Sequence, residues 1–272
     1  PAGKADSQAR FLGELAEAKA AHTHAIVPAH PFVFQAERSS DGRITCWHYD
    51  ATAAASWAAF SRAMVEQGYL IPGDPARSTV VAVYVVDEPN GGVCLDDSNG
   101  AANPTFVNAV NAIRQDPNTG SLPIASILST DFNAFSQGMQ LLDWVGYDHY
   151  GDSDKTWQKK MADLKQRTPG KKYIVVPGAM QGCQDVTRES TSRYFSAIEN
   201  DPDVTWIAPF AWFSGLGNNP NCRGVRDIPD LRAQYTAEGL KIRALQCSRS
   251  EADKNFCRGS SNISAAPQLI LN

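Results

Sequence analysis

The sequence feature that most constrains the fold is an apolar run, residues 80–86 (VVAVYVV), followed directly by Asp87-Glu88-Pro89-Asn90. A continuous valine-rich run is typical of a parallel strand with both faces covered, because neither face then needs polar side chains. Proline has no backbone N–H, so we expect strand pairing to stop at Pro89. Asp87 and Glu88 would then lie at the carboxyl end of the strand, which carries the active site in α/β barrels.

The rest of the chain alternates between strand-like and helical patterns. Such alternation is typical of a parallel sheet with crossover helices. Turn residues at 39–42 also predict a small hairpin before the second helix. The sequence predicts further strands at residues 24–28, 122–128, 141–151, 173–177 and 204–213, and helices at 6–21, 51–67, 105–115, 152–167, 187–199 and 228–238.

These patterns favour an α/β fold, a (β/α)8 TIM-like barrel that is incomplete or atypical at its N-terminal strands. The 272 residues fit the roughly 250 residues of one such barrel. We count six strong strands, whereas a closed barrel needs eight. Either two strands precede Pro1, or weaker segments at 43–47 and 268–271 complete the ring. We expect a catalytic barrel domain over residues 1–246 and a disulfide-pinned tail over residues 247–272.

The six cysteines show no C-x-x-C spacing of the kind that binds metals. Their even number favours disulfides over buried thiols and an extracellular location. Cys183 and Cys222 each follow one of two successive predicted strands, so we pair them. We also pair Cys46 with Cys94 and Cys247 with Cys257. A glycosylation sequon at residues 262–264 fits a secreted protein.

The charge of the chain restricts the class of partner. The formal net charge of −4 gives no basic field that would attract nucleic acid or anionic membranes. No apolar run approaches the roughly 20 residues that span a bilayer. We therefore expect a neutral or weakly charged partner, no nucleic acid, no membrane and a monomeric protein.

Glu88 is the first candidate for a catalytic residue. A carboxyl group at the end of an apolar strand suits general acid catalysis, because it lies where a barrel places its active site. We expect Ala82, Tyr84 and Glu88 to share the face that points into the barrel. The alternative is that Asp87 and Glu88 only cap the loop that follows.

Two short motifs resemble those of a known family. Asp87-Glu88-Pro89-Asn90 resembles the Asn-Glu-Pro signature that ends the fourth strand in a large clan of retaining (β/α)8 glycoside hydrolases. Phe210-Ala211-Trp212 resembles the aromatic segment at the end of the eighth strand in the same clan. The resemblance implies that Glu88 is the acid/base, that Asp87 contacts a sugar hydroxyl and that Trp212 is a stacking platform. In position it covers residues 24–215.

The sequence departs from the clan at strand seven. The clan places its nucleophilic Glu there, but the matching residues 175–181 (VVPGAMQ) contain no carboxylate. Asp148, at the end of the strand at 141–151, is the replacement candidate for base or nucleophile. Two such carboxyl groups lie about 5–5.5 Å apart for retention or about 6.5–9.5 Å apart for inversion. Alternatively, Asp148 binds a neighbouring Arg or His, and Asp87 and Asp131 are reserve candidates.

Aromatic side chains near the strand ends fit a carbohydrate site. The apolar face of a sugar ring packs on flat aromatic rings, and its hydroxyls need polar partners. Each aromatic residue has an equal claim to a place in the core. The residues expected to bind substrate are Asp87, Trp212, Tyr150, His149, Trp47 and Tyr84.

The sequence prediction is a secreted glycoside hydrolase that cleaves O-glycosidic bonds of an oligo- or polysaccharide. One alternative is a barrel that binds carbohydrate or protein without catalysis, given the missing Glu of strand seven. Another is a metal-dependent hydrolase or deacetylase with His30, Asp87 and His149 as ligands. No HExxH spacing supports that metal site, and no phosphate-binding glycine loop is present. We therefore expect no metal and no cofactor.

Overall fold

The computed structural model of the protein describes residues 3–183, 188–216, 219–247 and 269–270. The chain divides into two compact units. Residues 1–145 together with 269–272 form the first unit, and residues 146–268 form the second. The predicted Cys247–Cys257 disulfide and the predicted tail lie outside the described residues, apart from a short strand at Leu269–Ile270.

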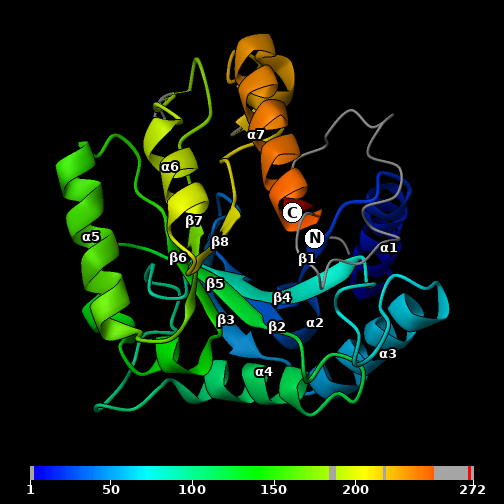
Figure 1. Cartoon of the computed structure of the whole chain (residues 1–272). Coiled ribbons are helices and arrows are strands. Elements are labelled where there is room, and N and C mark those ends of the chain that lie inside the picture. The colour runs from blue at the N-terminus through cyan, green and yellow to red at the C-terminus, as the bar shows by residue number, and fades with distance from the viewer. Residues whose placement is uncertain (1–2, 184–187, 217–218, 248–268, 271–272) are drawn as a thin grey trace. The chain divides into compact units, whose positions relative to one another are not determined.

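A parallel sheet forms the centre of the first unit. Its strands are β9 (Leu269–Ile270), β1 (Ala25–Pro28), β4 (Val80–Asp87) and β5 (Ile124–Leu128), in that order. Figure 1 shows β4 beside β5. The valine-rich run therefore is a parallel strand with a neighbour on each side, as its composition predicts.

Helices follow the strands of the first unit close to their predicted positions. Their apolar faces meet in an aromatic core in which Phe11, Phe32, Trp57 and Phe60 are fully buried or nearly so, and the Phe32 and Phe60 rings stack with centroids 4.5 Å apart. Pro104 begins one helix, and the side chain of Asn103 caps it by accepting from Thr105 N. The helices are α1 (Lys4–Ala20), α2 (His30–Val33), α3 (Ala53–Glu66) and α4 (Pro104–Arg114), with 3-10 turns η1 (Phe132–Phe135) and η2 (Gly138–Leu141).

The two weak segments predicted to complete the ring, residues 43–47 and 268–271, differ in how they pair. Residues 43–47 belong to β3 (Ile44–Tyr49), which pairs antiparallel with β2 (Phe34–Arg38) in a separate hairpin. This confirms the predicted hairpin and removes the segment from the parallel sheet. The C-terminal segment does join that sheet, because Leu269 and Ile270 pair in parallel with Ala25 and Ile26.

The second unit continues the alternation of strands and helices. Residues of β6 (Trp144–Tyr147) lie at the boundary, and β7 (Lys172–Val175) pairs in parallel with β8 (Val204–Ile207). Gly146 of β6 packs against β7 so closely that an added Cβ would lie 2.7 Å from Ile174 O. The helices are α5 (Asp154–Arg167), α6 (Ser192–Asn200) and α7 (Pro229–Cys247), with the short turn η4 (Val225–Asp227).

Several boundaries in the second unit differ from the sequence prediction. The strand predicted at 204–213 ends at Ile207, although Ala208 N still donates to Val175 O and Phe210 N to Pro177 O. The helix predicted from residue 187 begins at Ser192. Apart from the antiparallel β2–β3 hairpin, the strands described within each unit pair in parallel, which confirms the α/β class. An eight-stranded closed barrel is not confirmed by the described strands.

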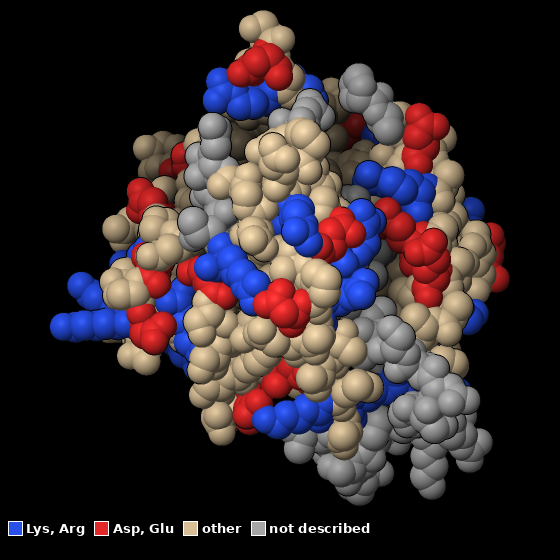
Figure 2. Space-filling view, turned by 90° about the horizontal axis from the view of Figure 1, so that it is seen from above, with Lys and Arg blue, Asp and Glu red and all other residues tan. Residues whose placement is uncertain are grey.

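Charged side chains of both signs lie next to one another on the face shown in Figure 2. The structure also contains ion pairs, for example Lys172 Nζ with Asp203 Oδ1 at 2.8 Å. Among the described helices, none is long and apolar enough to cross a membrane.

Candidate active site

The carboxyl end of β4 brings Asp87 and Glu88 to the edge of the parallel sheet. Four residues of β4, from Tyr84 to Asp87, lie opposite only three of β5, from Ala125 to Ile127. This irregularity is a bulge, which redirects the side chains that follow it. The regular alternation expected for residues 82–88 therefore breaks before Asp87.

Glu88 follows the bulge in a left-handed backbone conformation, with φ at 41°. Its N–H donates to Ile127 O at 2.9 Å, and its carbonyl accepts from Gly91 N at 2.8 Å. An added Cβ on Gly91 would lie 3.0 Å from Glu88 O and 3.2 Å from Glu88 Cβ, so glycine leaves space for the glutamate. Positive φ at a residue other than glycine is uncommon and is concentrated at functional sites.

Asp87 has a neighbouring hydrogen-bond donor in the same strand. The hydroxyl of Tyr84 donates to Asp87 Oδ1, and the tyrosine ring itself is 5% exposed. The pKa of Asp87 is raised, chiefly because surrounding protein displaces water from the carboxyl. The Tyr84 hydrogen bond opposes this shift, and the charge of Glu88 adds to it. The side chains of Tyr84 and Asp87 thus form a hydrogen-bonded pair at the carboxyl end of β4.

Asn90 fixes the loop after Glu88, a role that the sequence analysis missed. Its buried side-chain amide donates to Ser129 O at 3.1 Å and to Asp131 O at 2.8 Å, and it accepts from Ser129 N at 2.8 Å. The Ser129 hydroxyl also donates to Asn90 O. The loop after β4 is therefore tied to the end of β5. The Asp-Glu-Pro-Asn motif itself contained the signal, because a buried asparagine needs several partners.

Trp47 and His30 lie together in the first unit. Their ring centroids are 5.8 Å apart, and Trp47 is 8% exposed. Burial lowers the pKa of His30 to about 4, and the charge of Arg10 contributes further, so the imidazole is neutral at pH 7. Trp47 N donates to Val93 O, and the adjacent Cys46–Cys94 disulfide confirms the predicted pairing. The hairpin is thus bonded to the loop that follows Glu88.

The reserve and metal candidates have other contacts. The Asp131 carboxylate caps η1 by accepting from Asn133 N and Ala134 N. Among the described residues, one group of metal-binding side chains lies close together, Glu37 with Cys46 and His48. The sulfur of Cys46 is in a disulfide, so this group lacks its thiolate.

In the second unit, Asp148 follows β6 and is partly buried. The Tyr150 hydroxyl donates to Asp148 Oδ2 at 3.1 Å. His149 turns to a different partner, with its Nδ1 3.0 Å from Asp152 Oδ1. The structure thus brings Tyr150 to Asp148 and directs His149 to the loop that starts α5.

Trp212 lies in the segment after β8, which a main-chain hydrogen bond from η4 holds in place. Its carbonyl accepts from Arg226 N at 2.9 Å, and the Tyr150 and Phe210 rings stack with centroids 5.6 Å apart. Tyr150 and Phe210 pack on a small core that includes Cys222. Cys222 is bonded to Cys183, which confirms the second predicted disulfide. The aromatic segment is therefore supported by a covalent link between the loops after β7 and β8.

Glu189 is a buried carboxylate that the sequence analysis did not single out. It lies beyond residues 175–181, yet its Oε2 accepts from Gly178 N at 2.6 Å, three residues past the end of β7. The spacing of Glu189 and Arg193, four residues apart, was the available signal, since such residues pair on one turn of a helix.

The expected carboxylate pair is divided between the units. Glu88, Asp87, Tyr84 and Trp47 belong to the first unit, whereas Asp148, His149, Tyr150 and Trp212 belong to the second. The pairing of Glu88 with Asp148 stays a prediction, as does the metal site of His30, Asp87 and His149.

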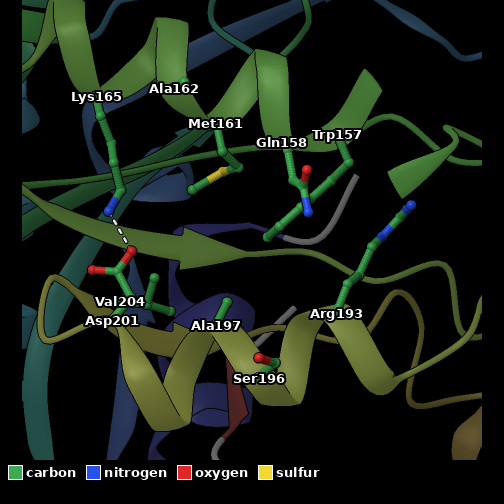
Figure 3. Close-up of a pocket in the computed structure, with 10 residues that line it drawn as sticks. All are labelled: Trp157, Gln158, Met161, Ala162, Lys165, Arg193, Ser196, Ala197, Asp201 and Val204. Atoms are coloured by element: carbon green, nitrogen blue, oxygen red, sulfur yellow. Dashed lines mark hydrogen bonds and ion pairs between the residues drawn. The ribbon is translucent and has the colours of Figure 1, made fainter. Parts of the chain in front are cut away.

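A groove of about 360 Å³ in the second unit lies away from these strand ends. Figure 3 shows side chains of α5 and α6 facing one another across it, with the Lys165–Asp201 ion pair at one end. Its lining comes from helices and the start of β8. None of the residues predicted to act in catalysis or to bind substrate lines it.

Comparisons with known proteins identify no family. No family model and no curated protein matches the chain. Among solved structures, a Ruminococcus gnavus β-glucuronidase aligns at 13% identity over 58% of this chain and 29% of that chain, with a TM-score of 0.38. A Ruminococcus gnavus sialic acid aldolase aligns at 10% identity over 84% and 65%, with a TM-score of 0.43. A GH128 endo-β-1,3-glucanase from Lentinula edodes aligns at 14% identity over 68% of both chains, with a TM-score of 0.35.

This chain thus spans less than two thirds of the length of the first two of these proteins. The likeness is too distant to carry an argument about the chemistry of this chain. The resemblance of its motifs to the glycoside hydrolase clan therefore stays a prediction.

Proposed function

We propose that the protein is a secreted glycoside hydrolase that cleaves O-glycosidic bonds of an oligo- or polysaccharide. Glu88 is the proton donor, and Asp148 is the base or nucleophile. The observation that carries the proposal is the end of β4, where Glu88 takes up a left-handed conformation directly beyond a parallel strand. A strand end is the place at which α/β folds collect catalytic groups.

The mechanism requires little beyond two carboxyl groups. Glu88 gives its proton to the glycosidic oxygen as the bond to the anomeric carbon breaks, so the leaving sugar departs as an alcohol. Asp148 either takes a proton from the water that attacks the anomeric carbon or attacks that carbon itself. In the second case water, which gives its proton to Glu88, breaks the glycosyl–Asp148 bond and restores both carboxyl groups. The carboxylate of Asp87, held by Tyr84, accepts a hydrogen bond from a sugar hydroxyl.

Aromatic residues supply the apolar part of the binding site in this proposal. Trp212 offers a partly buried indole, and its main chain is hydrogen-bonded to Arg226. Tyr150 donates to Asp148 and stacks on the Phe210 ring. Trp47 is nearly buried, so it offers only a small part of its surface to a sugar. The two disulfides support secretion, because such bonds persist in oxidising compartments.

The test is release of reducing sugar by the wild type and by Glu88→Gln across neutral, amino and acidic polysaccharides. Glu37→Gln is the matched control, since Glu37 is an exposed residue of the hairpin in the same unit. We expect release by the wild type and the control, and a loss of about 100- to 10,000-fold in Glu88→Gln, in which general acid catalysis is gone. An active Glu88→Gln variant would refute the assignment.

A non-catalytic carbohydrate-binding protein is the second candidate. The absence of a carboxylate from residues 175–181 favours it. Binding of an oligosaccharide by the wild type, with no product after long incubation, would support that reading over hydrolysis.

A further inference from the structure

A single buried side chain, Glu189, joins three parts of the second unit. Its Oε1 accepts from Gly151 N at 3.1 Å and from Arg193 Nη2 at 2.6 Å. Its Oε2 accepts from Gly178 N at 2.6 Å and from the Tyr194 hydroxyl at 2.8 Å. Four donors therefore converge on one carboxylate that is only 7% exposed.

The donors belong to segments that are distant in sequence. Gly151 lies in the loop after β6, three residues beyond Asp148, and Gly178 lies three residues beyond the end of β7. Arg193 and Tyr194 belong to the first turn of α6. Glu189 thus links the loop that carries Asp148 to the segment after β7 and to α6.

Arg193 extends this set of contacts along the same loop. Its Nη1 donates to Asp152 O at 2.6 Å, and the Asp152 carboxylate binds His149 and Lys160, each at 3.0 Å. The Arg193 side chain is 9% exposed, so Glu189 and Arg193 form a buried ion pair. Removing one member of such a pair leaves an uncompensated buried charge.

The location of Glu189 beside the end of β7 raises the question of a nucleophilic role. A nucleophile needs an oxygen that can approach an anomeric carbon. Both oxygens of Glu189 are engaged by two donors each, and the side chain is buried. This geometry is that of a group that orients its neighbours.

We infer that Glu189 is a positioning residue that sets the place of the loop bearing Asp148. The effect on catalysis rests on the proposed function, whereas the effect on the loop does not. A carboxylate is suited to this task, because only an ionised acid offers acceptor lone pairs on both oxygens and also balances the guanidinium. A glutamine would present an NH2 group, itself a donor, to two of these four donors.

Hydrogen exchange of Glu189→Gln, measured well below its melting temperature, tests the effect on the loop. We expect roughly tenfold or faster exchange at residues 148–152 and 177–182, because buried hydrogen bonds are lost there. Helix α4 of the first unit should exchange as in the wild type. Glu199→Gln is the matched control, since Glu199 lies on α6 and pairs with the exposed Lys241. Unchanged exchange at 148–152 in folded Glu189→Gln would overturn the inference.

Kinetics separate positioning from a purely structural role. Glu189→Gln should lower kcat roughly 10- to 100-fold with little change in KM, because a displaced catalytic group slows chemistry without removing substrate contacts. An unchanged kcat together with altered exchange would reject the catalytic consequence. If the wild type releases no sugar from any substrate, the proposed function fails, and the exchange result still decides the role of Glu189.

A milder variant covers the case in which Glu189→Gln does not fold. Tyr194→Phe removes only the hydroxyl that donates to Oε2. We expect a smaller increase in exchange in the same two segments. Exchange identical to the wild type in Tyr194→Phe, when Glu189→Gln is unfolded, would also count against the inference.

Discussion

The hydroxyl of Tyr84 donates a hydrogen bond to Oδ1 of Asp87, three residues farther along β4. Residues i and i+3 of a regular strand point to opposite faces, so this contact depends on the bulge between them. The bulge therefore creates a polar pair beside Glu88 from a run that is otherwise apolar.

Replacing Tyr84 by Phe should raise the pKa of Asp87 further, because the hydroxyl favours the ionised carboxyl. The folded-state pKa of Asp87 already lies above its unfolded value. The ionisation of Asp87 therefore reduces stability as pH rises from the unfolded pKa to the folded pKa. Because Asp87 is exposed, solvent screens this carboxyl, and Tyr84→Phe should lose only about 0.5–1 kcal/mol at pH 7 and less at low pH. Carboxyl NMR titration and urea unfolding at both pH values measure these effects.

Tyr69→Phe serves as the control for that measurement, since Tyr69 is a buried tyrosine of the same unit. Its titration of Asp87 should match the wild type. Equal Asp87 titration curves for Tyr84→Phe and the wild type would contradict the prediction.

Asn90→Ala should destabilise the first unit by about 2–3 kcal/mol. The substitution removes three side-chain hydrogen bonds and leaves Ser129 N without its acceptor. Urea unfolding gives the free energy, and Asn108→Ala, at an exposed position of α4, is the control. A loss below about 0.5 kcal/mol, the range of ordinary surface substitutions, would show that Asn90 does not hold the loop.

His30 should make the stability of the protein depend on pH. Its pKa falls from 6.5 in the unfolded chain to about 4 in the fold, so between these values only the unfolded chain binds the proton. Stability should therefore be complete above pH 6.5 and decrease as pH falls towards 4, by at most about 3 kcal/mol. His30→Gln should remove this part of the pH dependence.

Urea unfolding at pH 7 and pH 4.5 tests the role of His30 in both proteins. His48→Gln, at an exposed position of β3, should retain the wild-type pH dependence. The same pH dependence in His30→Gln and the wild type would show that His30 titrates normally.

The Cys183–Cys222 disulfide should stabilise the protein and support Trp212. It closes a loop of 39 residues, which corresponds to about 4 kcal/mol in the chain-entropy model. Replacing both cysteines by Ser should lower stability by up to that amount. It should also increase the solvent exposure of Trp212, which fluorescence quenching measures against a Trp212→Phe reference. Cys46 and Cys94, replaced in the same way, should leave Trp212 unchanged, because they lie in the first unit.

Local patterns in the sequence predict much of this structure. The strand from Val80 to Asp87, most of the helices, the hairpin and two disulfides agree with predictions from periodicity, turn residues and position. The bulge before Asp87 and the left-handed Glu88 were not predicted, because both depend on how β4 pairs with β5. Glu189 was missed for a similar reason. Its partners Gly151 and Gly178 lie 38 and 11 residues away, and no local pattern indicates such contacts.

Asn90 contacts the β5 end mainly through main-chain atoms, namely Ser129 N, Ser129 O and Asp131 O. Every amino acid supplies a main-chain carbonyl, and all but proline supply an N–H. The loop after β4 can therefore keep its place while the side chain at position 131 varies. Position 90 itself accepts few substitutes, since only an amide of this length both donates twice and accepts. Substitutions around Glu88 are thus tolerated at the end of β5 but not at Asn90.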